Sequence, residues 1–281
     1  MTVREFKALC AEELLKITDN TDFETEQIIR HVLKLSKNDY LLSRNREIPD
    51  KKLGKLFEAL NKRKDGVPLQ YICKEWDFYG LRIFCGEGCL IPRQETELIA
   101  EETIKRLKKR GHFIDLCTGS GCISIAVLNN VKLSSVQAVD KSAKALKYAF
   151  KNCKYHNLED RMDIIRCDIA KFVPKRKADI IVANPPYIKS GFIEMLPTEV
   201  KKEPRIALDG GEDGLYFYRI IAGRYGRYLK KNGIIICETG YDTANGAKKI
   251  FEENGFDTEI YKDYHGIDRM CVAKLKQELT V

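Results

Sequence analysis

The sequence lacks any apolar run long enough to cross a lipid bilayer, which argues against a membrane-spanning protein. Its first residues, MTVREFKALCAEELL, alternate charged and apolar positions and have no continuous apolar stretch of the kind found in secretion signals. We therefore expect a cytoplasmic protein that does not associate with a membrane.

The ten cysteines contain no CxxC pair, and none has a histidine at zinc-finger spacing. In a cytoplasmic protein we expect such cysteines to be reduced and mostly buried, and we predict no metal site. A zinc site built from Cys85, Cys89 and a histidine is the alternative. The four histidines share no spacing, and no Ser–His–Asp or paired-carboxylate arrangement is supported, so the histidines predict no chemistry.

What the chain does have is 281 residues, 44% of them hydrophobic, which is enough for one large or two ordinary domains. The net charge of +8 fits an acidic partner or one near nucleic acid without requiring either. Basic residues gather in 44–64 and 105–110, where solvated helix faces are the simpler explanation.

Apolar positions at three-to-four spacing predict helices over 3–18, 22–36 and 50–64, and we expect residues 1–68 to form a small helical domain. Residues 69–92 are aromatic, β-branched and interrupted by glycine, which predicts a β-hairpin linker.

Residues 93–281 alternate strand-like and helix-like segments after a predicted helix over 94–110. The predicted strands are 112–116, 135–140, 162–167, 178–183, 233–238, 257–263 and 269–275. The predicted helices between them are 122–130, 142–152 and 215–229. This alternation is typical of an α/β fold with a doubly wound, mostly parallel sheet of seven strands.

The first of these strands runs into a glycine turn, DLCTGSGCIS (115–124). Gly119 and Gly121 let the backbone turn tightly, and the free N–H groups of the following helix can bind a carboxylate or phosphate. Asp140 ends the second strand, where an acid can accept the two hydroxyls of a ribose. Asp168 follows the third strand, at the expected place of an adenine amine. Alternatives are an ordinary tight turn and a nicotinamide dinucleotide site, although Ser124 stands where that fingerprint needs a third glycine.

The fourth strand ends in VANPPYI (182–188), a corner in which proline cannot continue the ladder. The order of Gly119-x-Gly121, Asp140, Asp168 and Asn184-Pro-Pro-Tyr resembles the class I S-adenosylmethionine-dependent methyltransferases that methylate planar nitrogens. That resemblance favours a catalytic corner over a plain strand-ending turn.

The chemistry of the corner agrees with that resemblance. An amide nitrogen is a weak nucleophile because its lone pair is delocalised into the carbonyl. The Asn184 side-chain oxygen and the Pro185 backbone carbonyl can accept its two N–H groups, the double proline fixes that carbonyl, and Tyr187 offers a flat face for stacking. This is catalysis by positioning, which needs no metal.

Further segments resemble the release-factor glutamine N5-methyltransferases, the PrmC/HemK family, over nearly the whole chain. They are GVPLQYI (66–72), EWDFYGLRI (75–83), LIPRQETELI (90–99) and EPRIALDGGEDGLYFYRII (203–221). The resemblance implies transfer of a methyl group from S-adenosylmethionine to the glutamine of the GGQ motif in peptide chain release factors. It also implies a helical domain that helps to dock the factor.

The resemblance also implies the site residues. The expected cofactor site comprises Asp115, Cys117, Thr118, Gly119, Ser120, Gly121, Asp140, Asp168, Ile169 and Asn184. The expected substrate site comprises Asn184, Pro185, Pro186, Tyr187, Arg93, Thr96 and Glu97, with capping of the following helix as the alternative role of the last three. Asn184, Pro185 and Tyr187 are the expected catalytic residues.

Some positions depart from the family pattern. Gln94 stands where proline is usual, Cys117 replaces a glycine before the turn, and Ile169 replaces an aromatic residue found in some members. Cys73-Lys74 also replaces a glycine pattern. None of these changes removes a catalytic atom, but Cys117 puts the cofactor affinity in question.

A long segment, 188–211, follows the catalytic corner and is typical of a lid or substrate grip. Within it we expect Glu203 and Arg205 to brace the loop, and we expect Glu238 to anchor local hydrogen bonds. We expect a monomer that does not bind nucleic acid directly.

Three rival functions remain. They are methylation of a ribosomal-protein glutamine, methylation of a nucleic-acid base amino group, and a non-enzymatic cofactor-binding module. The helical domain carries aromatic residues at core positions rather than a base-flipping surface, which disfavours the second.

Overall fold

A computed structural model describes residues 1–276 and divides the chain into two compact units. The first unit contains Met1–Glu75 together with Pro197–Lys202, and the second contains Trp76–Leu196 and the chain from Glu203 onward. Residues 277–281 of the predicted second domain lie outside the described part. Within residues 1–276, no helix is both long and apolar enough to span a bilayer.

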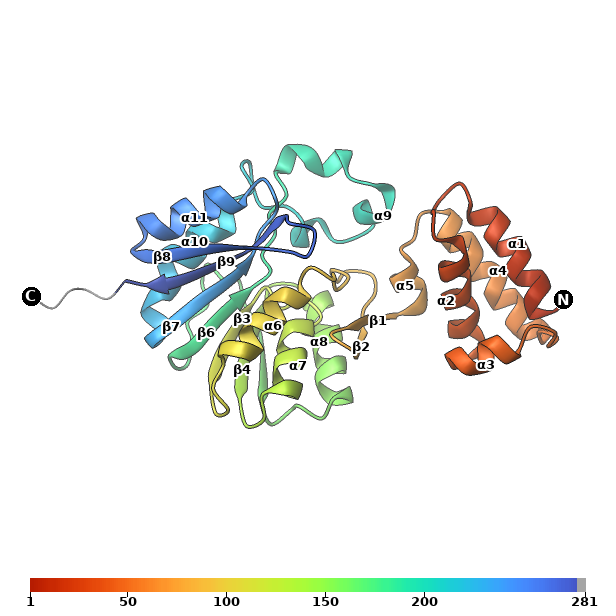
Figure 1. The fold of residues 1–281 in the computed structure, drawn as a ribbon, viewed down its shortest axis with the longest axis horizontal. Helices are drawn as coiled ribbons and strands as arrows, with labels where there is room; N and C mark the ends of the chain where they lie inside the picture. The colour runs from red at the N-terminus through yellow and green to blue at the C-terminus, as the bar shows by residue number, and fades with distance from the viewer. Residues whose placement is uncertain (277–281) are drawn as a thin grey trace, which may run out of the picture. The chain divides into compact units, whose positions relative to one another are not determined.

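The first unit is helical, as its apolar spacing predicts (Figure 1). Its helices are α1 (Val3–Leu14), α2 (Thr21–Leu33), α3 (Lys37–Leu42), α4 (Asp50–Lys64), α5 (Leu69–Cys73) and the one-turn α9 (Thr198–Lys201). Thr2 and Glu5 form a capping box that starts α1. Phe6, Ile28 and Leu56 are fully buried, so α1, α2 and α4 share one apolar core.

A buried cation lies within this unit. The side chain of Arg63 in α4 is only 1% exposed, and it donates to both carboxylate oxygens of Glu24 in α2, at 2.5 and 3.0 Å. Its Nη2 also donates to Glu199 in α9 at 2.5 Å. The ion pairs therefore tie the segment 197–202 to the helical unit in which it lies.

The stretch 69–92 is only partly the predicted hairpin. It begins with α5, where the N–H groups of Tyr71 and Ile72 donate to the carbonyl of Pro68. The hairpin consists of β1 (Glu75–Phe78) and β2 (Leu81–Phe84). Its two turn residues, Tyr79 and Gly80, both have positive φ, as a tight two-residue turn requires. A hairpin is thus present within the predicted range, and a short helix that follows Pro68 precedes it.

The second unit is built on one seven-stranded sheet with the strand order β5-β4-β3-β6-β7-β9-β8. The strands are β3 (His112–Leu116), β4 (Ser135–Asp140), β5 (Met162–Arg166), β6 (Ala178–Ala183), β7 (Leu229–Glu238), β8 (Phe256–Lys262) and β9 (Asp268–Leu275). The pairings among β5, β4, β3, β6 and β7 are parallel, and β9 pairs antiparallel with both β7 and β8. The predicted doubly wound, mostly parallel α/β fold is confirmed.

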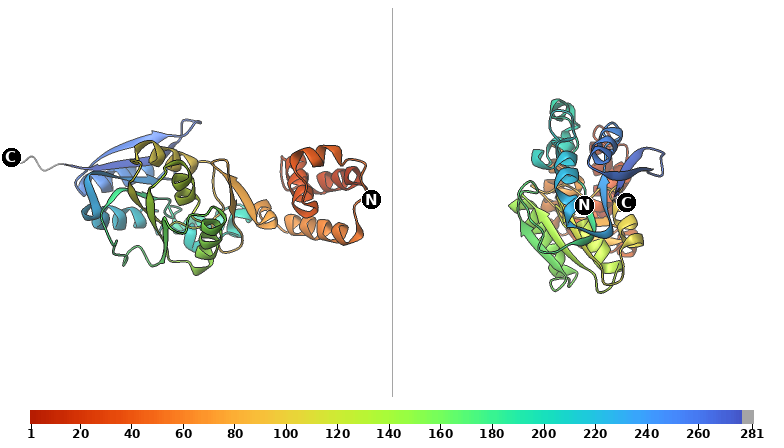
Figure 2. Two further views of the ribbon diagram at one scale, coloured as in Figure 1. Left: turned by 90° about the horizontal axis from the view of Figure 1, so that it is seen from below. Right: turned by 90° about the vertical axis from the view of Figure 1, so that its left-hand side faces the viewer.

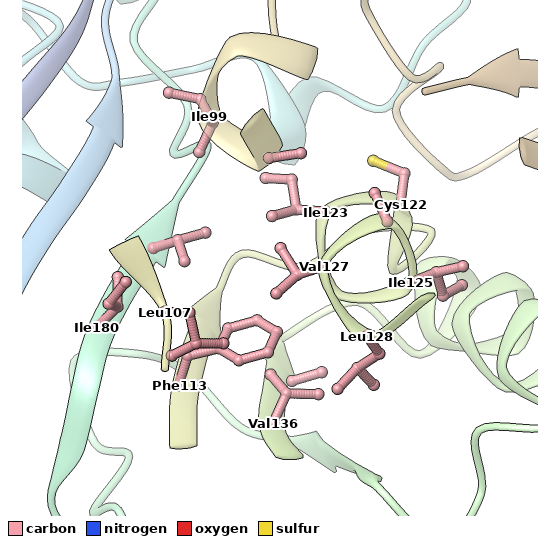
Figure 3. Close-up of a cluster of buried hydrophobic side chains, with 14 of the residues drawn as sticks. Ile99, Leu107, Phe113, Cys122, Ile123, Ile125, Val127, Leu128, Val136 and Ile180 are labelled. Carbon is pink, nitrogen blue, oxygen red and sulfur yellow. The ribbon is translucent and has the colours of Figure 1, made fainter. Parts of the chain in front are cut away.

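Helices cover both faces of this sheet, as Figures 1 and 2 show. One face packs against α6 (Glu97–Arg106), α7 (Cys122–Asn130) and α8 (Ala143–Tyr155). The other packs against α10 (Tyr216–Tyr225) and α11 (Ala244–Glu253). Successive residues of β3 alternate between these cores, since Phe113 lies in the first and Ile114 in the second. Figure 3 shows Phe113 packed among α7 side chains such as Val127 and Leu128.

The parallel register brings the functional ends of several strands to one edge of the sheet. Leu116 in β3 is paired with Ala183 in β6, and Ala183 is paired with Cys237 in β7. The residues that follow these three positions, and those after β4, therefore emerge side by side. In open α/β sheets this edge is where ligands bind.

Candidate active site

The glycine turn joins β3 to α7 in the predicted place. Cys117, Gly119 and Gly121 all have positive φ, at 61°, 57° and 80°. A Cβ on Gly121 would lie 2.9 Å from the flexible terminal methyl of Met162, which could shift, so it is the positive φ that favours glycine here. The positive φ of Cys117 gives a physical reason why a glycine is expected there.

Asp115 lies beneath this turn and is completely buried. Its Oδ2 accepts hydrogen bonds from the hydroxyls of Thr118 and Ser124, each at 2.6 Å. Its Oδ1 is buried without a hydrogen-bond partner among residues 1–276. Burial raises the pKa of Asp115 to about 6, although the hydrogen bonds from the two hydroxyl groups lower it. The carboxyl group therefore has unused capacity to stabilise a nearby positive charge.

Asp140 and Asp168 follow neighbouring strands at the same sheet edge. Asp140 accepts from the backbone N–H of Gly119 at 2.9 Å and from that of Ser142 at 2.7 Å. Burial raises the pKa of Asp140 despite these donors. Asp168 pairs with Lys141 at 2.9 Å, and this hydrogen bond lowers the pKa of Asp168. The glycine turn and the two acids thus form one connected structure.

A cavity of about 160 Å³ opens at this edge. Of the predicted site residues it is lined by Arg93, Thr96, Cys117, Thr118, Gly119, Ser120, Asp140, Asp168, Ile169, Asn184 and Pro186. The predicted residues outside its lining are Asp115, Gly121, Glu97, Pro185 and Tyr187. Tyr216 and Phe217, at the start of α10, also line the cavity. They were not predicted from the sequence, because their spacing is that of an ordinary amphipathic helix.

Asn184 is the first residue after β6 and contributes its side chain to the cavity. Its Nδ2 donates to the hydroxyl of Thr96 at 3.0 Å. Neither the Oδ1 of Asn184 nor the backbone carbonyl of Pro185 has a hydrogen-bond partner within residues 1–276. Two acceptors in the same short corner therefore have no protein partner, and of their two residues only Asn184 lines the cavity.

Tyr187 is not among the residues that line the cavity, and its hydroxyl is engaged on another side chain. Its hydroxyl donates to Oε1 of Glu238 at 3.2 Å, and burial raises its pKa well above the usual range. The backbone of the corner is instead held from the other side. A Cβ on Gly210 would come within 2.7 Å of the Tyr187 Cα, and one on Gly214 within 2.5 Å of the Tyr187 carbonyl oxygen. The glycines of LDGGEDG therefore allow this loop to pack directly on the corner.

Glu203 and Glu97 have structural partners. Glu203 is buried and accepts from the Ile91 N–H at 2.9 Å and from the guanidinium of Arg93. This geometry matches the bracing role expected of Glu203. Glu97 accepts from the backbone N–H of Tyr79 at 2.8 Å, which ties α6 to the hairpin. Arg93 remains at the cavity wall, with its charge balanced by Glu203.

All ten cysteines are free thiols, and eight of them are buried. In the part of the chain that the structure describes, no group of three or more His, Cys, Asp or Glu side chains could hold a metal ion.

Comparisons with known proteins follow the same division of the chain. The methyltransferase small domain family matches residues 94–199, and the PrmC N-terminal domain family matches residues 9–73. A protein of Fusobacterium nucleatum named release factor glutamine methyltransferase is 42% identical over 261 residues, covering 91% of this chain and 73% of the relative. One of the same name from Aquifex aeolicus is 35% identical over 270 residues, covering 95% and 96%.

Among solved structures, the hMettl16 catalytic domain, in complex with an RNA hairpin of the MAT2A 3′UTR, aligns with a TM-score of 0.54 at 17% identity. The alignment covers 83% of this chain and 84% of that chain. At this identity the likeness concerns the fold alone, which agrees with the α/β fold predicted from the alternation of strands and helices.

Proposed function

This chain belongs to the release factor glutamine methyltransferases, and we propose that it transfers a methyl group from S-adenosylmethionine to the side-chain amide nitrogen of the GGQ glutamine in peptide chain release factors. The observation that carries the proposal is the pair of unengaged acceptors, Asn184 Oδ1 and the Pro185 carbonyl, in a corner that directly follows β6. A primary amide has two N–H groups to offer to such a pair.

The two acceptors would hold and activate the substrate nitrogen. Hydrogen bonds from its N–H groups to Asn184 and Pro185 orient the nitrogen lone pair toward the cavity and favour its pyramidal form. The double proline keeps the carbonyl fixed, so no reorganisation is required during the reaction. We propose Asn184 and Pro185 as the catalytic groups and assign Tyr187 the role of holding the corner through Glu238.

The residues around the cavity fit S-adenosylmethionine. This cofactor supplies a methyl group on a positively charged sulfonium. Asp140 would bind its ribose hydroxyls, Asp168 its adenine amine, and the glycine turn its amino-acid end. The buried, unpartnered Oδ1 of Asp115 adds a negative potential beneath that end, which suits the cofactor's ammonium group. Cys117 and Ile169 would line the pocket wall.

We further propose that Arg93 and Pro186 contact the glycine-rich backbone around the substrate glutamine, since both line the cavity. Thr96 lines it too, but its hydroxyl is engaged by Asn184. Glu97 is assigned to the hairpin, where its carboxylate is already used.

The helical unit offers a docking surface for the rest of the factor. A groove of about 300 Å³ lies between α2, α4 and α5, with an apolar floor that includes Val32, Ala59 and Ile72. Five lysines surround it: Lys34, Lys52, Lys55, Lys62 and Lys74. Lys62 pairs with Glu58, and Lys52 donates to the Val32 carbonyl. The other three have no ion pair within residues 1–276. We propose that this lysine groove, defined by these five lysines, binds an acidic segment of the release factor.

The function is tested by incubating the protein with S-adenosylmethionine and a purified release factor and then mapping methylation by peptide mass spectrometry. We expect one methyl group on the GGQ glutamine side chain, and methylation slower by about 10²-fold or more with the Asn184→Ala protein at the same concentration. Methylation of other residues only, or of RNA only, would refute the assignment.

A further inference from the structure

Glu238 is a buried acid for which the proposed reaction has no direct use. It is the last residue of β7, is 2% exposed, and sits beside the catalytic corner because β7 pairs in parallel with β6. Its Oε2 accepts from the Thr96 hydroxyl at 2.5 Å, and its Oε1 accepts from the Tyr187 hydroxyl at 3.2 Å. The Thr96 hydroxyl in turn accepts from Asn184 Nδ2 at 3.0 Å. Glu238 and Asn184 are therefore joined through a single hydroxyl group.

The direction of these hydrogen bonds follows from the charge on Glu238. An ionised carboxylate can only accept, so the Thr96 hydroxyl must donate its one proton to Glu238. Thr96 then presents only lone pairs to Asn184, and only the NH₂ group of the Asn184 amide can satisfy them. The Oδ1 atom must consequently point the other way, where it has no partner within residues 1–276.

We propose that Thr96 and Glu238 are positioning residues that lock the Asn184 amide in the one orientation that presents Oδ1 to the methyl-accepting nitrogen. The inference rests on the proposed function of Asn184. With the opposite orientation, Asn184 would present an NH₂ donor to the substrate NH₂ group, and the two would repel. The hydrogen bonds from Glu238 through Thr96 to Asn184, called the lock below, thus select the reactive orientation of the amide. The other orientation, with the amide oxygen and nitrogen exchanged, has nearly the same shape.

The surroundings of Glu238 make this lock sensitive to pH. Burial raises the pKa of Glu238 to about 7, and the hydrogen bonds from Thr96 and Tyr187 oppose that shift. Glu95 raises the pKa further, and Arg269 lowers it. The Cys122 thiol interacts electrostatically with Glu238, and the Tyr218 hydroxyl donates to the backbone carbonyl of Glu238 at 2.7 Å. Both groups stay neutral because burial raises the pKa of each.

Protonation of Glu238 would remove the directional constraint. A neutral carboxyl group can donate to the Thr96 hydroxyl, which is then free to donate to Oδ1 of a flipped Asn184. The lock therefore predicts that kcat falls as the pH drops through about 7, with a single proton taken up. Cofactor binding, which does not use Oδ1, should not follow the same curve.

The central variant is Thr96→Val, which keeps the shape of the side chain and removes the hydroxyl. We expect kcat for release factor to fall about 10- to 100-fold, the range usual for loss of an outer positioning partner. The dissociation constant for S-adenosylmethionine, measured by calorimetry, should stay within about twofold because Thr96 is not among the residues that we assign to cofactor binding. Thr96→Ser restores the hydroxyl and should recover most of kcat.

Thr103→Val is the matched control. Thr103 lies two turns further along α6, is also fully buried, and donates only to the Ile99 carbonyl of its own helix at 2.7 Å. It should lower stability as Thr96→Val does but leave kcat unchanged. Equal losses of kcat in the two variants would reduce Thr96 to a structural residue and overturn the proposal.

A double variant separates this inference from the proposed function. Adding Thr96→Val to Asn184→Ala should lower kcat no further, because the lock has nothing left to orient. Normal kcat in Thr96→Val beside an inactive Asn184→Ala would refute the lock and leave the proposed function standing. Normal kcat in Asn184→Ala would refute the catalytic role of that residue, and the lock with it.

The pH profile of the wild-type protein tests the proposal without depending on whether a variant folds. Wild-type kcat at saturating substrates should show an acidic limb near pH 7, and Glu238→Gln should show a low kcat without that limb. A wild-type kcat that is flat between pH 6 and pH 9 would overturn the proposal.

Discussion

The buried ion pair of the helical unit gives the most quantitative prediction. Arg63 is 1% exposed at its side chain, and Glu24 is 10% exposed. Replacing Arg63 by Met preserves much of the side-chain volume but leaves the Glu24 carboxylate buried without its cation. Breaking a buried pair in this way typically costs about 3–5 kcal/mol. A domain of this size has a total stability of only about 4–11 kcal/mol, so Arg63→Met should remove a large part of it.

The matched double variant Arg63→Met/Glu24→Met removes both charges together. Because two apolar side chains of similar volume can replace a buried pair at little cost, we expect the double variant to be at least about 2 kcal/mol more stable than Arg63→Met alone. Glu199 is 40% exposed at its side chain, so water can solvate it once Arg63 is gone.

The assay is urea unfolding followed by circular dichroism, with the midpoint and slope fitted for each unit where two transitions are seen. Alongside it, methyl transfer is measured on a whole release factor and on a short GGQ peptide. Arg63→Met should impair transfer to the whole factor more than transfer to the peptide, because the cavity belongs to the second unit. An Arg63→Met protein as stable as wild type, or a double variant as unstable as the single one, would refute the reasoning.

Three other predictions concern the site and the groove. Asn184→Ala should bind S-adenosylmethionine normally but lose about 10²-fold or more in kcat, as measured by single turnover; near-normal turnover would contradict its role as acceptor. Asp115 has a pKa raised from 3.8 to about 6, so its stabilising contribution is complete below pH 3.8 and is lost as the pH rises through 6. In the wild type, the free energy of unfolding measured in urea should therefore decline between pH 4.5 and pH 7.5, and Asp115→Asn should flatten this decline. An unchanged decline would show that Asp115 is not its cause. Charge reversal at Lys55 and Lys74 should weaken methylation of a whole factor with little effect on a GGQ peptide, whereas equal losses on both would exclude the lysine groove as a docking surface.

The fold could be predicted from the sequence because its strands are short apolar runs separated by clear helical and turn signals. The strands 112–116, 135–140 and 178–183 were predicted at their observed bounds. Helix α11 was not predicted, since its buried face includes the small residues Ala244 and Ala247, which give a weak periodic signal. Helix α3 is a six-residue segment and is too short to show a period.

The site was predicted less completely than the fold. Glycine and acid positions could be identified because local backbone geometry requires them, as the positive φ of Gly119 and Gly121 shows. The interaction of Thr96 with Glu238 spans 142 residues of sequence and requires α6 to pack against β7, which pairs in parallel with β6. The orientation of Tyr187 toward Glu238 depends on the same pairing, and no local pattern could have indicated it.

The central claim is that the protein methylates a glutamine amide, and one measurement tests it most directly. Labelled methyl transfer from S-adenosylmethionine is measured with a purified release factor, the same factor with its GGQ glutamine changed to alanine, ribosomal protein, and RNA. We expect label in the unaltered factor alone. Methylation of the GGQ glutamine would be contradicted if the altered factor carried as much label as the unaltered one. It would also be contradicted if only ribosomal protein or RNA were labelled.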